Sequence, residues 1–330
     1  MSLIEALRAL ADPTRLRIMR LLASMELAVG ELAQVLGQSQ PRVSRHIKIL
    51  CDAGLAERRR EGGWVFLRAA VSETGAPEYL GTALARVLVS AESSDPAFGS
   101  QCAEDGQHLV AIRTAREASS ADYFARHAAE WDELRSLHIA DGPVETALGE
   151  MLEGPVGRLL DVGTGTGRIA ELFAGRASHL TGLDKSPEML RLARTRLQHL
   201  PASDVTLVQG DFAQLPFADA SFDTVLFHQV LHYAFAPQAV LAEAARVTAP
   251  GGRVVIVDFA PHDREELRTA HAHARLGFSD AQIAALLTAA GFEPAGDRAL
   301  AGRELIVKIW AGVRRSERAA QPEFPRLVTQ

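Results

Sequence analysis

Residues 159–167, which read Leu-Leu-Asp-Val-Gly-Thr-Gly-Thr-Gly, decide the fold of the C-terminal part of the chain. Arg158–Val162 is a short apolar run with Asp161 near its end, and it predicts a buried strand. Three alternate glycines follow, and Ile169–Ala174 then has helical character. A strand, a glycine turn and a helix let backbone amides approach a ligand at the helix amino terminus. The spacing differs from G-x-G-x-x-G, and the phosphate-binding lysine of a P-loop is missing.

Further strands are expected on the C-terminal side of this motif, with helical segments between them. They are Leu180–Asp184, Val205–Val208, Phe222–Phe227, Arg253–Phe259 after a Pro-Gly-Gly turn, and a final strand at Glu304–Ala311 that would close the sheet. A helix capped by Ser279 and stopped by Gly291 precedes the last one. Alternating strands and helices predict an α/β fold with a doubly wound parallel sheet and a ligand at the carboxyl ends of its strands.

Two acidic residues lie at the ends of strands of this sheet, where a ligand would bind. Asp184 ends the second strand, 17 residues after Gly167, and its carboxylate could accept from both hydroxyls of a ribose. Asp211 follows the third strand and could accept from the amino group of an adenine, with Phe212 packing on the base. The spacing therefore indicates a nucleoside site.

The motifs occur in a fixed order: LLDVGTGTG, TGLDKSPEML, QGDFAQLPF, FDTVLFHQVLHY and APGGRVVIVD, within residues 156–260. This series resembles the class I S-adenosylmethionine-dependent methyltransferases, which have a Rossmann-like sheet. The resemblance implies S-adenosylmethionine or S-adenosylhomocysteine as the ligand. It assigns the methionine portion to Asp161, Gly163 and Gly165, the ribose to Asp184, the adenine to Asp211 and Phe212, and the methionine end to His228. The full expected cofactor set is Asp161, Gly163, Thr164, Gly165, Gly167, Asp184, Lys185, Met189, Gly210, Asp211, Phe212 and His228.

Methyl transfer needs an aligned nucleophile and exclusion of water, and a general base only when the acceptor must lose a proton. The catalytic candidates are His228, His232 and Tyr233, with Asp258, His262, His271 and His273 as further groups near the expected acceptor. His271 and His273 are two positions apart on an expected helix and would point away from each other, so no metal site is expected.

Several acceptors are excluded by missing motifs. Neither Asn-Pro-Pro-Tyr nor Asp-Pro-Pro-Tyr follows the fourth strand, which argues against methylation of base amino groups in DNA, and no Pro-Cys nucleophile is present for cytosine C5. The chain has only two cysteines, Cys51 and Cys102, which excludes arsenite methylation and a disulfide framework. The methyl acceptor therefore stays open, and a small molecule is the first hypothesis for it.

The N-terminal segment predicts a winged helix. Asp12-Pro13-Thr14 breaks the apolar periodicity of residues 3–22 into two helices, Val29–Leu36 is a short helix stopped by Gly37, and Ser39 can cap a helix over Gln40–Ala53. Ala56–Arg60 and Trp64–Arg68 then form a hairpin. The second helix of the helix-turn-helix and the wing carry the expected DNA-binding residues. These are Ser39, Gln40, Arg42, Ser44, Arg45, Lys48, Arg58, Arg59 and Arg60.

Leu7–Leu22 (LRALADPTRLRIMRLL) and Gln40–Leu55 (QPRVSRHIKILCDAGL) resemble the ArsR-type repressors over residues 1–70. The resemblance implies a homodimer that binds operator DNA and releases it when an inducer binds. Metal-sensing members carry cysteines before the recognition helix, where this chain has Leu27–Leu32. An arsenic or zinc sensor of the usual type is therefore not expected.

The charge distribution agrees with two modules. The 330 residues have a net charge of −6, yet residues 1–70 carry eleven basic and seven acidic side chains, giving +4, and the remainder carries −10. We expect a DNA-binding domain at 1–75, a helical dimerisation or linker region at 76–140, a methyltransferase domain at 141–313 and a disordered tail at 314–330. Pro77–Ala91 is expected to be helical and to pair in the dimer, and Ser93–Gly106 to be a linker.

The segment Leu109–Leu137 is a second expected helical stretch. Its aromatic residues Tyr123, Phe124 and Trp131 either pack without a chemical role or line one wall of a ligand pocket. With 47% hydrophobic residues, no apolar run of membrane-spanning length and no secretory start, a cytoplasmic protein without membrane contact is expected.

Three functions fit this sequence. The first is a transcription regulator whose methyltransferase domain methylates a small molecule, couples cofactor binding to DNA release, or does both. The alternative is a catalytically silent repressor of methionine or methyl-cycle genes that senses S-adenosylmethionine or S-adenosylhomocysteine. A plain enzyme dimerised by its winged helix is disfavoured by the intact recognition face. The sequence does not decide between enzyme and sensor.

Overall fold

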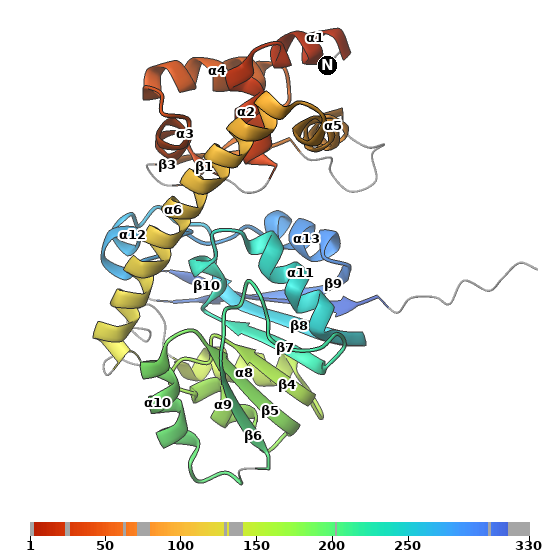
Figure 1. Ribbon diagram of the computed structural model, residues 1–330. Helices are drawn as coiled ribbons and strands as arrows, with labels where there is room; N and C mark the ends of the chain where they lie inside the picture. The colour runs from red at the N-terminus through yellow and green to blue at the C-terminus, as the bar shows by residue number, and fades with distance from the viewer. Residues whose placement is uncertain are drawn as a thin grey trace, which may run out of the picture.

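The computed structural model describes residues 3–23, 27–61, 64–70, 80–128, 131, 141–201, 203–302 and 305–315. Figure 1 shows an N-terminal helical module above an α/β domain, with the long helix α6 running from the first alongside the second. The two modules predicted from the sequence are confirmed.

The N-terminal module is a winged helix. Its elements are α1 (Leu3–Leu10), α2 (Pro13–Leu22), β1 (Leu27–Ala28), α3 (Val29–Leu36), α4 (Gln40–Asp52), β2 (Ala56–Glu61) and β3 (Trp64–Ala69). The Asp12 carboxylate caps α2 by accepting from Arg15 N at 3.1 Å, and Gly37 ends α3 at φ +62°. Ser39 occupies the cap position of α4 as predicted, but its side chain makes no capping hydrogen bond within the described structure.

Burial on one side orients the recognition helix α4. Val43, Ile47 and Leu50 are at most 1% exposed and face the N-terminal core, as predicted. Strands β1, β3 and β2 form a small antiparallel sheet beside them. The opposite face of α4 is left to solvent.

Two further helices complete this core and correct the predicted linker at Ser93–Gly106. Helix α5 spans Leu80–Ser94 and α6 spans Pro96–His127, so the segment is almost entirely helical. The Asp95 carboxylate caps α6 by accepting from the amides of Ala97 and Phe98, and Pro96 occupies its first turn. A side chain at Gly99 would come within 2.5 Å of the Glu92 carbonyl, so the glycine allows α5 and α6 to touch.

The C-terminal module is built on a seven-stranded sheet of order β6-β5-β4-β7-β8-β10-β9. Its elements are α8 (Asp141–Met151), β4 (Gly157–Val162), α9 (Arg168–Phe173), β5 (Ala177–Asp184), α10 (Pro187–Leu197), β6 (Val205–Gln209), β7 (Phe222–His228), the 3-10 turn η2 (Leu231–Tyr233), α11 (Pro237–Val247), β8 (Thr248–Phe259), α12 (Glu266–His271), α13 (Asp280–Ala289), β9 (Phe292–Ala301) and β10 (Ile306–Arg314). Strands β4 to β8 are parallel, as predicted.

The last two strands of the chain differ from the prediction. The expected last strand is β10, which inserts antiparallel between β8 and β9 and does not close the sheet. Strand β9, which was not predicted, forms the edge. The predicted tail lies outside the described residues from position 316 onward, while Arg314 and Arg315 are described.

Apolar residues fill both faces of this sheet. One cluster holds Leu148, Leu159 and Phe173, and a second holds Val225, Leu241 and Phe292. Because the neighbouring strands β6, β5, β4, β7 and β8 are parallel, their carboxyl ends meet at one edge. Residues that follow β4, β5, β6 and β7 are thereby brought together.

Candidate functional site

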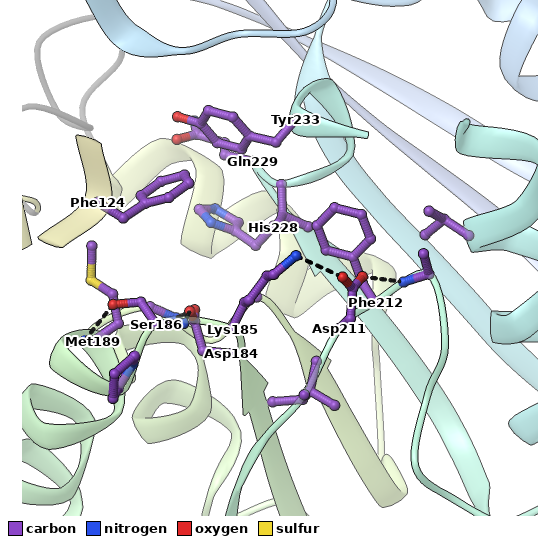
Figure 2. A pocket seen from close by; sticks show the side chains of 18 of the residues that line it. Phe124, Asp184, Lys185, Ser186, Met189, Asp211, Phe212, His228, Gln229 and Tyr233 are labelled. Carbon is purple, nitrogen blue, oxygen red and sulfur yellow. Dashed lines mark hydrogen bonds and ion pairs between the residues drawn. The ribbon is translucent and has the colours of Figure 1, made fainter. Parts of the chain in front are cut away.

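A cavity opens at the carboxyl ends of β4, β5, β6 and β7 (Figure 2). Its walls come from the glycine turn, the loops after β5, β6 and β7, the start of α11 and the end of α6. The lining residues are Phe124, Trp131, Gly163, Gly165, Leu183, Asp184, Lys185, Ser186, Pro187, Glu188, Met189, Gly210, Asp211, Phe212, Ala213, His228, Gln229, Val230, Tyr233, Phe235, Ala236, Ala239 and Val240.

The glycine turn presents bare backbone to this cavity. Gly163 and Gly165 have φ of +70° and +53°, and a Cβ on Gly163 would lie 2.4 Å from Val230 Cγ2. The sequence suggested that the amides of this turn face the ligand. Instead, Gly163 N and Thr164 N donate to the Leu183 carbonyl, and Gly165 N donates to Asp184 Oδ2 at 2.9 Å. These amides therefore hold the turn against the end of β5.

Asp184 is fixed at the end of β5 as predicted. Its Oδ2 accepts from Gly165 N and its Oδ1 accepts from Ser186 N, both at 2.9 Å. Burial raises the pKa of this carboxyl, and the backbone hydrogen bonds oppose that rise. The carboxylate keeps further lone pairs for hydroxyl donors in the cavity.

The loop after β6 forms the neighbouring wall. Lys185 Nζ lies 2.9 Å from Asp211 Oδ2, and Asp211 Oδ1 accepts from Ala213 N at 2.8 Å. Figure 2 shows this pair next to Phe212. Met189 lies in the first turn of α10 and also lines the cavity, with its amide donating to Ser186 Oγ.

Two predicted cofactor residues lie behind the turn. Asp161 is 1% exposed, accepts from Thr164 Oγ1 at 2.7 Å, and with Thr164 lines a smaller hollow that shares Gly163, Gly165 and His228 with the main cavity. Gly167 lines neither space. It begins α9, and a Cβ there would meet Ala193 at 3.1 Å, so it permits α9 and α10 to pack closely.

Aromatic side chains also line the cavity. Phe124 and Trp131 are part of its lining, as one of the two alternatives predicts, whereas Tyr123 packs beside them and does not belong to the lining. The rings of Phe124 and Tyr233 lie edge to face with centroids 4.9 Å apart. Burial raises the pKa of Tyr233 well above its usual value, so its hydroxyl stays protonated at neutral pH.

His228 and Gln229 leave β7 at the centre of the cavity in Figure 2. Gln229 has φ +53°, a conformation that is costly for a residue with a side chain and that occurs often at functional sites. Sequence reasoning missed Gln229, because nothing in the motif indicates its backbone conformation.

The other titratable candidates lie away from the cavity. His232 is 2% exposed and its Nδ1 lies 2.8 Å from Asp258 Oδ1, while His273 packs on the His232 ring at 4.1 Å between centroids. His271 Nδ1 is hydrogen-bonded to the Tyr123 hydroxyl at 2.7 Å. Helix α12 ends at His271, so the expectation that a helix holds both His271 and His273 is wrong.

His262 accepts from Arg264 N through Nδ1. Within the described ranges, no three histidine, cysteine or acidic side chains are grouped to hold a metal ion. In the same part of the chain, no helix is long and apolar enough to span a membrane.

The exposed face of α4 carries most of the residues expected to contact DNA. Gln40, Arg42, Arg45 and Lys48 are exposed there, and Ser44 is half-buried. Lys48 Nζ pairs with Asp52 at 2.7 Å. On the wing, Arg68 pairs with Glu57 and Arg58 lies beside Cys51, whereas the side chains of Arg59 and Arg60 lie outside the described structure.

Two family models match the chain. Residues 12–58 match the model described as "Bacterial regulatory protein, arsR family", and residues 160–256 match "Methyltransferase domain". The chain therefore carries an ArsR-family helix-turn-helix and a methyltransferase domain.

Curated relatives match in the methyltransferase part. A demethylmenaquinone methyltransferase of Tropheryma whipplei (strain Twist) is 41% identical over 102 residues, covering 31% of this chain and 41% of the relative. A phosphatidylethanolamine N-methyltransferase of Cereibacter sphaeroides is 39% identical over 112 residues, covering 34% and 55%. A malonyl-[acyl-carrier protein] O-methyltransferase of Serratia marcescens is 34% identical over 154 residues, covering 47% and 58%. The chain thus spans about half the length of these relatives.

A solved structure agrees on the fold. The complex of the Haloferax volcanii Trm112 methyltransferase activator with a methyltransferase matches with a TM-score of 0.50 and 23% identity, covering 59% of this chain and 97% of that one. The sheet is that of a class I methyltransferase, and S-adenosylmethionine is the cofactor of the domain. The cavity fits this cofactor, because its lining combines bare glycine backbone at Gly163 and Gly165 with the carboxylates of Asp184 and Asp211 and the ring of Phe212.

Proposed function

We propose that this protein is a DNA-binding transcription regulator whose methyltransferase domain transfers a methyl group from S-adenosylmethionine to a small molecule and couples cofactor binding to DNA release. One observation carries the proposal. The cavity that holds Asp184 and Asp211 is also lined by Phe124 of α6, a helix that packs into the core behind the exposed recognition helix. The domain boundaries expected from the sequence, 1–75, 76–140 and 141–313, belong to the same proposal.

Different residues of the pocket would hold different parts of the cofactor. Asp184 would hold the ribose hydroxyls, and Asp211, oriented by Lys185, would accept from the adenine amino group while Phe212 packs on the base. The methionine portion would lie along the backbone of the glycine turn, near Asp161 and Thr164. Met189 and Gly210 close the adenosine side, and Gly167 acts through packing.

S-adenosylmethionine supplies a methyl group on a positively charged sulfur, ready for in-line displacement. The chain supplies alignment and a dry site, since the aromatic side chains of Phe124, Trp131, Tyr233 and Phe235 line the cavity. His228 also lines the cavity and is the candidate base. Tyr233, kept protonated by burial, would donate a hydrogen bond to the acceptor. His232 and Asp258 would position the turn that carries Tyr233.

The acceptor side favours an uncharged, flat and largely apolar molecule. Its walls are aromatic and aliphatic, and its polar contributions come from His228, Gln229 and the Tyr233 hydroxyl. An anionic acceptor would be expected to meet a lysine or arginine, and the one basic side chain that lines the described pocket, Lys185, pairs with Asp211. Among the relatives, the demethylmenaquinone methyltransferase bears the name that agrees best with this chemistry.

The test combines DNA binding with turnover. A fragment of the protein's own promoter is titrated with protein, and S-adenosylmethionine or S-adenosylhomocysteine is then added to the complex. We expect either ligand to weaken DNA binding at least fivefold. In parallel, methyl-labelled cofactor is incubated with protein and a cell metabolite extract, and label is expected in the organic phase. Release without any methyl transfer would instead identify the ligand-sensing repressor, and absence of DNA binding would refute the regulator.

The N-terminal module also exposes apolar side chains suited to a homodimer. On α1, Ile4 and Leu7 are 62% and 50% exposed, and on α5, Val87 and Val89 are 60% and 49% exposed. Exposed apolar residues gathered on two helices of one module favour a protein partner. Operator DNA with two half-sites would match a symmetric pair.

Replacing both Leu7 and Val87 with aspartate is expected to convert the dimer into a monomer, because each buried charge at the interface lacks a partner. Light scattering at micromolar concentration measures the mass directly. The matched control is Leu172→Asp on α9, where a 40% exposed leucine lies in the other domain. A wild-type protein that is monomeric in this measurement would remove the homodimer.

A further inference from the structure

Residues 262–275, which include α12 and are called here the α12 segment, lie between the wing and the mouth of the cofactor pocket. Figure 1 shows α12 just below the N-terminal module, at the top of the α/β domain. The segment contacts β3 on one side and the loop after η2 on the other. It is therefore placed to connect the two functions.

On the wing side, the contact is one aromatic ring facing two cations. Phe66 in β3 is 7% exposed. The guanidinium carbon of Arg268 lies 5.2 Å from the centre of its ring, and that of Arg275 lies 5.9 Å away. Cation–π contacts of this kind are strengthened when the groups are withdrawn from water.

On the pocket side, Arg275 holds the backbone of the loop. It is 5% exposed, and its amide donates to the His232 carbonyl at 2.9 Å. Its Nη2 donates to the Phe235 carbonyl at 2.8 Å and its Nε to the Ala234 carbonyl at 3.4 Å. One buried side chain thus spans from the wing to the backbone of residues that line the pocket.

Phe235 connects the cofactor pocket to the N-terminal module. It lines the cofactor pocket and also packs against the apolar core of the N-terminal module. A ligand that fills the acceptor side must contact Phe235. Any shift of this ring would change its packing against the core behind α4.

A second connection runs through α6. Near its start, Asp105 is paired with Arg17 of α2, with Arg17 Nε 2.7 Å from Asp105 Oδ2, and His108 Nδ1 contacts the Val35 carbonyl of α3 at 3.0 Å. Near its end, Phe124 lines the pocket and the Tyr123 hydroxyl is hydrogen-bonded to His271 of the α12 segment. Both series of contacts therefore reach the α12 segment and the residues that line the pocket.

We propose that Arg275 is a positioning residue which, together with Phe66, transmits occupancy of the cofactor pocket to the winged helix. The inference rests on the proposed function and deepens it by naming the regulated contact. In the reverse direction, DNA bound to the wing sets the Tyr233 and Phe235 wall, since coupling between two binding sites is reciprocal. The factor by which S-adenosylhomocysteine changes the Kd for DNA must equal the factor by which DNA changes the Kd for S-adenosylhomocysteine.

The test is a coupling cycle on full-length protein. The Kd for a promoter fragment is measured with and without saturating S-adenosylhomocysteine, and the Kd for S-adenosylhomocysteine with and without DNA, in wild type and in Phe66→Leu. Wild type is expected to show a factor of at least five in both directions. Phe66→Leu keeps an apolar side chain but lacks the ring face, so the factor is expected to fall below two while each separate Kd stays within threefold of wild type.

Two variants control this result. Phe66→Tyr restores the ring face and is expected to restore the factor, which a merely structural loss would not predict. Arg264→Gln alters an arginine of the same segment whose Nε contacts Glu266, and it is expected to leave the factor unchanged. If Phe66→Leu does not fold, Arg268→Gln removes one of the two cations facing the ring and is expected to reduce the factor at least threefold.

The outcomes separate the inference from the proposed function. A full coupling factor in Phe66→Leu, or in Arg268→Gln where that variant is used, overturns the inference. Wild type that binds both DNA and S-adenosylhomocysteine with a factor of one overturns the inference together with the coupling in the proposed function, and it leaves DNA binding and cofactor binding standing. Wild type that binds no promoter DNA refutes the regulator and the coupling together.

Discussion

Asp184→Asn is expected to weaken binding of S-adenosylhomocysteine at least about 100-fold. Hydrogen bonds to a charged acceptor contribute roughly 1.5–3 kcal/mol each, and two ribose hydroxyls would lose such an acceptor, a loss of about 3 kcal/mol or more. An asparagine amide also turns a donor toward one of these hydroxyls. Because the carboxylate already accepts from Gly165 N and Ser186 N, its position is fixed before the ligand arrives, and little binding energy is spent on ordering it.

Isothermal titration calorimetry of wild type and variant measures this loss. Asp204→Asn is the matched control, because that exposed carboxylate lies before β6 and outside the pocket lining. Asp184→Asn should leave promoter binding without ligand within threefold of wild type. Unchanged affinity for S-adenosylhomocysteine in Asp184→Asn would show that the ligand does not use this end of β5.

The pH dependence of binding has a defined sign. Burial raises the pKa of Asp184, so its carboxyl takes up a proton at a higher pH than an exposed aspartate does. The neutral form loses acceptor capacity, and affinity should therefore fall as the pH is lowered through that raised pKa. In Asp184→Asn this part of the pH dependence is expected to vanish.

Local signals in the sequence were sufficient for most of the elements that build the site. Asp12 and Gly37 mark helix ends by their own chemistry, and the strands before Gly163 and Asp184 are short segments that are mostly apolar and buried towards their ends. Strand β9 gave no such signal. Of its ten residues only Phe292 is buried, and the strand exists because its backbone pairs with β10, a contact that forms only in the folded chain.

The missed helix start at Asp95 has a different cause. The serines, glycines and proline between 93 and 106 indicate a linker, whereas Asp95-Pro96 is a capping pair followed by a helix whose buried members within this stretch are Cys102 and Asp105. Asp105 is buried because it pairs with Arg17, 88 positions away. No local window contains that partner.

The same limit applies to the pocket. Its cofactor side follows strand ends, which sequence motifs locate. Its acceptor side combines Trp131 and Phe124 with Phe235 and the first turn of α11, and only tertiary packing brings these segments together. For that reason the sequence leaves Phe124 and Trp131 with two alternative roles, packing or a pocket wall, and it gives no indication that Phe235 lines the pocket.

The second large effect is expected from removing Arg45, an arginine of the recognition helix α4. Arg45 is exposed on the face of α4 opposite Val43, Ile47 and Leu50, so its removal leaves the core of the winged helix intact. A guanidinium that contacts a guanine edge contributes about 1–3 kcal/mol, which corresponds to a loss of roughly 5-fold to 150-fold in Kd. Lys48 on the same face is paired with Asp52, which leaves Arg45 and Arg42 as the stronger candidates for direct contact.

Arg45→Ala is therefore expected to weaken promoter binding at least fivefold while the Kd for S-adenosylhomocysteine stays within twofold of wild type. Fluorescence anisotropy with a labelled promoter fragment at several salt concentrations measures both the loss and its origin. A phosphate contact would lower the slope of log K against log salt by about one, whereas a base contact would lower affinity for the operator more than for unrelated DNA. Arg194→Ala, an exposed arginine on α10, is the control and should bind DNA as wild type does. Because Asp184 and Arg45 belong to different modules, equal impairment of DNA and ligand binding by both variants would contradict the separation of the two sites.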